Sequence, residues 1–93
     1  MKETRVDFKQ SAFEDFKELA ANKRLGGLAR KYYRELFDFP PGEWGRMRRQ
    51  FGKNTFVSDR HIPFVIKVVV VEERADLAHL YVTEFKARPQ LEK

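Results

Sequence analysis

The segment Ile62–Glu72, with the sequence IPFVIKVVVVE, constrains the fold most, because it is the only long apolar run in the chain. Valine and isoleucine are branched at Cβ and favour extended backbone, and proline is tolerated at the beginning of a strand. The run therefore predicts one central strand. Its even positions from 64 to 70 are all apolar and predict the face that packs on the core: Phe64, Ile66, Val68 and Val70. The odd positions are apolar except for Lys67, which suggests that the chain ends or a partner cover this second face.

A short amphipathic strand over Thr4–Phe8 is predicted first, and a helix follows it. Ser11 and Glu14 have the spacing of a capping box, in which the hydroxyl accepts from an amide three residues on and the carboxylate reaches back. This spacing predicts a helix from Ser11 to about Ala21. Apolar residues at steps of three and four predict its buried stripe: Phe13, Phe16, Leu19 and Ala20.

A second helix is predicted to end before Pro40-Pro41-Gly42, because proline lacks an amide donor and disfavours helix in the preceding residue. Gly26 and Gly27 leave its first residue open, since glycine is a poor helix former. The residues of its apolar face are Leu25, Leu28, Ala29, Tyr32, Leu36 and Phe39.

Strands are also predicted on both sides of the central run, over Arg46–Phe51 and Leu77–Phe85. We interpret Asn54–Arg60 as a loop or a distorted strand edge, and Glu72–Asp76 as a tight polar connection. The facing of the last strand stays open. Strict alternation would place Leu80, Val82 and Glu84 on one side of this strand. It would place Tyr81, Thr83 and Phe85 on the other, so neither side is purely apolar.

The resulting order, β-α-α-β-β-β, predicts an α+β fold with a helical hairpin packed on one face of a largely antiparallel sheet. The last three strands form a meander in this arrangement. The other face of the sheet stays available for binding.

Composition bears on partners more than on fold. The chain has 19 Lys and Arg against 14 Asp and Glu, a net charge of +5. This excess favours a nucleic-acid or acidic protein partner, although it also keeps a small domain in solution. The absence of cysteine excludes disulfides, thiolate metal sites and cysteine nucleophiles. We find no signal peptide or membrane span in the sequence and expect a cytoplasmic protein without membrane contact.

No strong catalytic signature is present. The glycines fit neither the P-loop spacing nor the dinucleotide-binding spacing. His61 and His79 lack companions at a metal-ligand spacing, so we expect no metal and no cofactor. Basic residues interleave with aromatic ones in a set suited to single-stranded nucleic acid, because cations hold phosphates and rings stack on bases. Alternatively, the aromatics belong to the core and the arginines form a solvated rim. The set is Arg46, Arg48, Arg49, Phe51, Lys53, Phe56, Arg60, His61, Tyr81, Phe85, Lys86 and Arg88.

Four features follow one another over nearly the whole chain: a short first strand, the helix sequence SAFEDFKEL, the basic strand RMRRQF, and Ser58-Asp59-Arg60-His61 before the β-branched strand. In this layout the chain resembles the RelE/ParE superfamily of toxins from toxin-antitoxin systems. The family has a glycine-aspartate-aromatic-arginine segment before that strand. Its last strand ends in a His/Lys-Arg-Arg segment and a tyrosine, whereas this chain reads TEFKARP over residues 83–89, and no tyrosine follows. The resemblance implies one domain over residues 1–93.

The ribonuclease branch of that family implies cleavage of messenger RNA in the ribosomal A site and inhibition of translation. There the 2′-hydroxyl attacks the adjacent phosphate and basic side chains stabilise the developing charge. By resemblance, the phosphate stabilisers are Arg60, Lys86 and Arg88. The proton acceptor is His61 or Glu84. The residues that guide the RNA backbone are Arg46, Arg48, Arg49 and Lys53.

Two alternatives stay open. A non-catalytic member of the same fold would bind a protein, as the ParE branch binds DNA gyrase or a phage-type inhibitor binds a host protein. The missing tyrosine and the apolar second face of the central strand favour it. A basic RNA- or DNA-binding module is the other alternative, although no recognition signature is found. The expected partners are RNA or the ribosome, with an acidic antitoxin or another protein as a further candidate.

Overall fold

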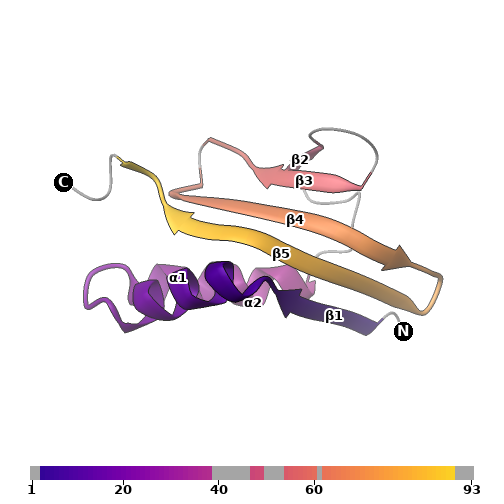
Figure 1. Cartoon of the computed structure of the whole chain (residues 1–93), viewed down its shortest axis with the longest axis horizontal. Coiled ribbons are helices and arrows are strands. Elements are labelled where there is room, and N and C mark those ends of the chain that lie inside the picture. Colours follow the sequence, from indigo (N-terminus) through magenta and orange to yellow (C-terminus); the bar gives the residue numbers. More distant parts are fainter. Residues whose placement is uncertain (1–2, 39–46, 50–53, 61, 90–93) are drawn as a thin grey trace.

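The computed structural model describes residues 3–38, 47–49, 54–60 and 62–89. Two helices form a hairpin on one side of a curved sheet (Figure 1). The elements in chain order are β1 (Glu3–Phe8), α1 (Gln10–Ala21), α2 (Gly26–Asp38), β2 (Met47–Arg49), β3 (Thr55–Ser58), β4 (Phe64–Glu73) and β5 (Leu77–Ala87). No helix in these ranges is long and apolar enough to cross a membrane.

The sheet has the strand order β1-β5-β4-β3-β2. The strands from β2 to β5 form an antiparallel meander, and only β1 runs parallel to its neighbour, β5. This arrangement confirms the predicted α+β class and the largely antiparallel sheet. The segment interpreted as a loop or a strand edge contains a strand of its own, β3, because Phe56 is buried and pairs with Val68 of β4.

The core lies between the helices and the face of β4 that the sequence predicts. Phe64, Ile66, Val68 and Val70 are all buried. The intervening Val65, Lys67 and Val69 are half-buried on the opposite face. The predicted polarity of the two faces of β4 is therefore confirmed. The core residues on the other elements are Ala12, Phe16, Leu25, Ala29, Leu36, Phe56, Ile62, Leu80, Val82, Phe85 and Ala87.

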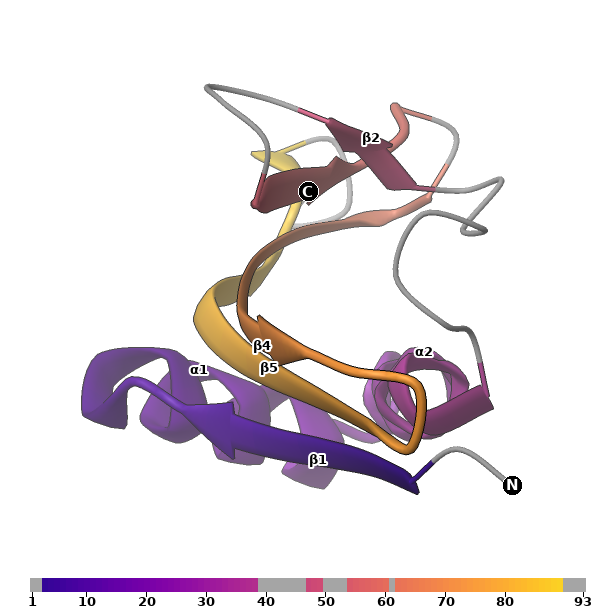
Figure 2. The ribbon, with the colours of Figure 1, turned by 90° about the vertical axis from the view of Figure 1, so that its right-hand side faces the viewer.

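A β-bulge decides how β5 faces. Glu84 pairs with Lys67 and Val82 pairs with Val68, so Thr83 is an extra residue with no partner in the ladder. Because of this insertion the buried positions change phase, and the core receives Leu80, Val82, Phe85 and Ala87. A second irregularity occurs at Val71, where β4 has the extra residue. Bulges bend and twist strands, and both strands curve strongly in Figure 2.

The first helix begins one residue earlier than predicted and is not capped by Ser11. Lys9 is the N-cap residue, and no side chain makes a capping hydrogen bond. Ser11 lies inside the first turn and is exposed, so the predicted capping box is wrong. The buried stripe also includes Ala12 in place of Phe13, whose side chain is 43% exposed. Phe13 instead packs at the edge of the core, with its ring 5.6 Å from that of Phe8.

Asn22 makes the turn between the helices. Its side-chain Oδ1 accepts hydrogen bonds from the amides of Arg24 and Leu25, at 2.8 and 2.9 Å. Its carbonyl accepts from the amide of Gly26 at 2.8 Å. These contacts satisfy amides just before and at the start of α2 and direct the chain back along α1.

The helix α2 uses most of the predicted apolar face. Ala29 and Leu36 are buried, and Tyr32 packs against the core from a half-buried position. Leu28 is 39% exposed and is not a core residue, in contrast to the prediction. Phe39 lies outside the described residues.

Candidate functional site

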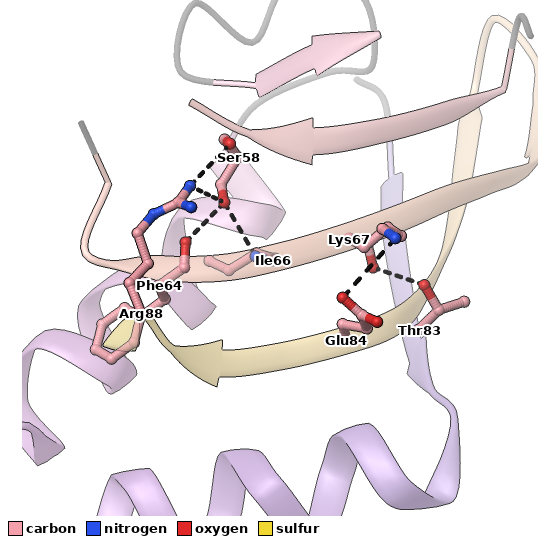
Figure 3. Close-up of polar contacts among 7 residues, drawn as sticks. All are labelled: Ser58, Phe64, Ile66, Lys67, Thr83, Glu84 and Arg88. Carbon is pink, nitrogen blue, oxygen red and sulfur yellow. Dashed lines mark hydrogen bonds and ion pairs between the residues drawn. The ribbon is translucent and has the colours of Figure 1, made fainter. Parts of the chain in front are cut away.

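The sheet face opposite the helices carries both polar and apolar side chains. Val65 and Val69 on β4 and Tyr81 on β5 are half-buried there. Lys67 and Glu84 form an ion pair of 3.8 Å across β4 and β5, and their side chains are 32% and 37% exposed (Figure 3). An ion pair this open to solvent contributes little to stability, so both groups can exchange it for a ligand.

One end of this face concentrates the basic residues. The end of β5 lies beside the beginning of β4, since Lys86 pairs with Val65 and Ala87 with Phe64. The segment after β3 returns to the same place, because the Arg88 amide donates to the Pro63 carbonyl at 3.1 Å. We call the region around Arg60, Lys86 and Arg88 the basic end.

The guanidinium of Arg88 is held by main-chain carbonyls at the basic end. Its Nε donates to the carbonyl of Ile62 at 2.7 Å. Its Nη2 donates to the carbonyl of Asp59 at 3.0 Å and to that of Ser58 at 3.2 Å. Figure 3 shows this side chain turned back toward Ser58. Arg88 therefore ties the end of β5 to the segment that precedes β4.

Ser58 is the buried centre of this network, with 4% of its surface exposed. Its hydroxyl donates to the carbonyl of Phe64 at 2.7 Å and accepts from the amide of Ile66 at 3.0 Å. The Arg88 Nη2 lies 3.5 Å from the same oxygen. One hydroxyl thus satisfies two main-chain groups of β4 that the end of β3 leaves without a ladder partner.

Arg60 and Lys86 are the exposed cations of the basic end. Arg60 follows Asp59 in a turn that is closed by a 2.9 Å hydrogen bond from the Ile62 amide to the Asp59 carbonyl. The side chain of neither Arg60 nor Lys86 makes a hydrogen bond or ion pair with another residue in the described part of the chain. The structure therefore brings together the three residues that the resemblance assigns to phosphate stabilisation, in two different states: two exposed and one anchored.

The other predicted site residues are placed only in part. Glu84 lies on the same strand face as Lys86, opposite Lys67. Arg48 and Arg49 belong to β2, the edge strand beside β3, and their side chains lie outside the described residues. The remaining predicted site residues lie entirely outside the described residues: Arg46, Lys53 and His61.

The aromatic residues divide between the two interpretations. Phe56 and Phe85 are buried core residues, and the Phe85 ring packs 5.0 Å from that of Phe16. Tyr81 is half-buried on the open face, where it pairs with Val69. Phe51 lies outside the described residues. Tyr81 is therefore the described aromatic on the open face that remains a candidate for base stacking.

A polar pair that the sequence did not reveal lies toward the opposite end of the sheet. His79 Nε2 on β5 is 2.6 Å from Asp7 Oδ2 on β1, and Arg5 Nε is 3.4 Å from the same oxygen. The parallel pairing of β1 with β5 creates this contact, and no sequence pattern around either residue predicts it. Within the ranges that the structure describes, no group of three or more acidic or histidine side chains could hold a metal ion.

An open groove of about 520 Å³ borders the basic end on the helix side. It is lined by Asp15, Glu18, Leu19, Asn22, Arg24, Leu25, Lys86 and Ala87. The carboxylates of α1 would repel a polyanion in this groove, so the groove suits a phosphate backbone less well than the open face does.

Comparison with protein-family models, curated proteins and solved structures finds no match for this chain.

Proposed function

We propose that the protein is a RelE-like toxin that cleaves messenger RNA on the ribosome and thereby inhibits translation. The observation that supports the proposal is the basic end, which has two exposed cations, Arg60 and Lys86, and an anchored third, Arg88. A scissile phosphate needs cations that are free to approach it, and these side chains have that freedom.

In the proposed reaction the 2′-hydroxyl oxygen attacks the adjacent phosphorus, and its proton passes to Glu84 or His61. The bond from phosphorus to the 5′-oxygen breaks, and the products are a 2′,3′-cyclic phosphate and a 5′-hydroxyl end that takes up a proton. Arg60 and Lys86 stabilise the charge that develops on the phosphate oxygens. Glu84 is suited to the proton transfer because it lies on the same strand face as Lys86.

The test is to induce the protein in bacteria and to follow growth and messenger cleavage. We expect growth arrest and cut transcripts with the wild-type chain, and loss of both with the Arg60→Ala/Lys86→Ala variant. Arg74→Ala is the matched control. Arg74 is an exposed arginine in the β4–β5 hairpin, at the far end of the sheet, where its Nε pairs with Glu72 at 3.0 Å. The control should keep full activity.

Unimpaired growth with intact transcripts would overturn the proposal. Growth arrest with intact transcripts but damaged DNA would indicate that the protein poisons DNA gyrase and does not cleave RNA. Equal loss in the Arg74→Ala control would show that total charge, and not the basic end, matters.

Non-catalytic binding to a protein is the second candidate, and the same site supports it in a different way. The Arg88 guanidinium is bound to carbonyls, and the open face carries half-buried valines that neither α1 nor α2 covers: Val57, Val65 and Val69. Charged substitution at Val69 would abolish activity that depends on such a partner. Under the ribonuclease proposal it would leave cleavage at the basic end largely intact.

A further inference from the structure

We infer that Arg88 is a positioning residue, whose guanidinium fixes the backbone on both sides of Arg60 and does not itself contact the RNA phosphate. The consequence for RNA rests on the proposed function. The geometry of the contact does not depend on it. The inference departs from the resemblance, which assigns Arg88 to phosphate stabilisation.

The contacts of Arg88 enclose the turn that carries Arg60. Nη2 binds the carbonyl of Asp59, the residue before Arg60, and Nε binds the carbonyl of Ile62, two residues after it. One planar group thus tethers both sides of the turn, in addition to the 2.9 Å hydrogen bond that closes it. Such a turn cannot move away from β5 without losing several charge-assisted hydrogen bonds.

The tether is anchored in the sheet. Arg88 also lies 3.5 Å from the hydroxyl of Ser58, which is itself bound to the carbonyl of Phe64 and the amide of Ile66. The main chain at Arg88 adds the hydrogen bond to Pro63. Figure 3 shows the guanidinium, the Ser58 hydroxyl and β4 linked in one network. The position of Arg60 is therefore set by the rigid part of the fold.

Arginine suits this role better than lysine does. The carbonyls of Ser58, Asp59 and Ile62 are reached by two nitrogens of a fixed planar fork. An ammonium group has a single nitrogen and cannot span the same acceptors. We therefore expect Arg88→Lys to lose the tether although it keeps the charge.

The first experiment measures amide hydrogen exchange in the RNA-free protein, at the Ile62 amide that closes the turn. We expect exchange at least about tenfold faster in Arg88→Lys and Arg88→Gln, the change that loss of one charge-assisted hydrogen bond produces. Arg60→Ala should leave this rate unchanged. An Ile62 rate that is unchanged in Arg88→Lys would overturn the inference, and this variant serves if Arg88→Gln does not fold.

The second experiment measures binding of a short single-stranded oligoribonucleotide at several salt concentrations. Each phosphate contact to a single strand contributes about 0.7 to the slope of log K against log salt. Arg60→Ala should reduce the slope by about this amount, whereas Arg88→Gln added to Arg60→Ala should cause no further reduction. A further reduction in this double variant would make Arg88 a phosphate ligand and overturn the inference.

The two proposals fail in different ways. If Arg60→Ala changes neither the salt slope nor cleavage, the proposed function fails, while the Ile62 exchange rate still reports on the tether. If Ile62 exchange is insensitive to residue 88, the tether fails, whatever the RNA does.

Discussion

The hydroxyl of Thr83 donates a 3.3 Å hydrogen bond to the main-chain carbonyl of Lys67, at the point where β5 has one residue more than β4. This bulge allows apolar residues of opposite parity, Val82 and Phe85, to enter the same core. It also directs Glu84 and Lys86 to the open face, so core and candidate site depend on the same extra residue.

Deletion of Thr83 should leave the protein folded. Without the extra residue, Val82 and Glu84 become neighbours in regular alternation, so Phe85 stays in the core and Glu84 and Lys86 stay on the open face. Thr83→Ala removes only the hydrogen bond and should cost about 1 kcal/mol. Urea denaturation followed by circular dichroism measures both. If Thr83 were a regular ladder residue, its deletion would reverse the facing of every later residue of β5, so an unfolded deletion variant would contradict the assigned bulge.

The two adjacent glycines of α2 should respond to alanine in opposite directions. A Cβ on Gly26 would lie 2.5 Å from the carbonyl oxygen of Ala20, whereas a Cβ on Gly27 meets nothing within 4 Å. Gly26→Ala should cost about 1–3 kcal/mol because α1 and α2 must move apart. Gly27→Ala should stabilise the fold by about 0.5 kcal/mol through helix propensity. Thermal melts compare the pair, and equal effects would exclude close helix contact at Gly26.

Ser11→Ala tests the start of α1. Since Ser11 is exposed inside the first turn and Lys9 is the N-cap, alanine should be neutral or stabilise the protein by up to about 0.5 kcal/mol. A capping serine would instead lose about 1 kcal/mol on the same change. The free energy of unfolding from urea titration separates the two results, and a clear loss of stability would restore the capping box.

Glu84→Gln separates a chemical role of this carboxylate from a structural one. The 3.8 Å ion pair with Lys67 is open to solvent, so its loss should change the free energy of unfolding by no more than about 0.5 kcal/mol. If Glu84 accepts the proton, single-turnover cleavage of ribosome-bound messenger should slow by about a hundredfold or more. Glu72→Gln in the β4–β5 hairpin is the control and should cleave normally. An unchanged rate in Glu84→Gln would exclude it as the acceptor.

Local patterns were sufficient for most of the elements, although they left β3 open as a loop or a strand edge. The alternation in β4 correctly predicts Phe64, Ile66, Val68 and Val70 as core, because burial of one strand face follows directly from side-chain periodicity. The helix boundaries near Ala21 and before Pro40 are also close to the observed ends. The prediction at Ser11 was wrong because a capping sequence makes a cap possible but does not require one. The helix begins one residue earlier, at Gln10.

For the candidate site, the sequence offered candidate residues but not their arrangement. The sequence indicated Arg60, Lys86 and Arg88 together, yet it could not show that one of them is bound to carbonyl oxygens. Main-chain carbonyls carry no residue identity, so a side chain that uses them as partners leaves no motif along the chain.

By itself, the amino-acid sequence determined the two helices, the strands other than β3, the core face of the central strand and the basic character of the chain, because each depends on neighbouring residues. Tertiary structure alone decided the parallel pairing of β1 with β5, the bulge at Thr83 and the tether between Arg88 and the turn at Arg60. These depend on how segments distant in sequence meet, and the geometry of that meeting is set by packing of the whole core.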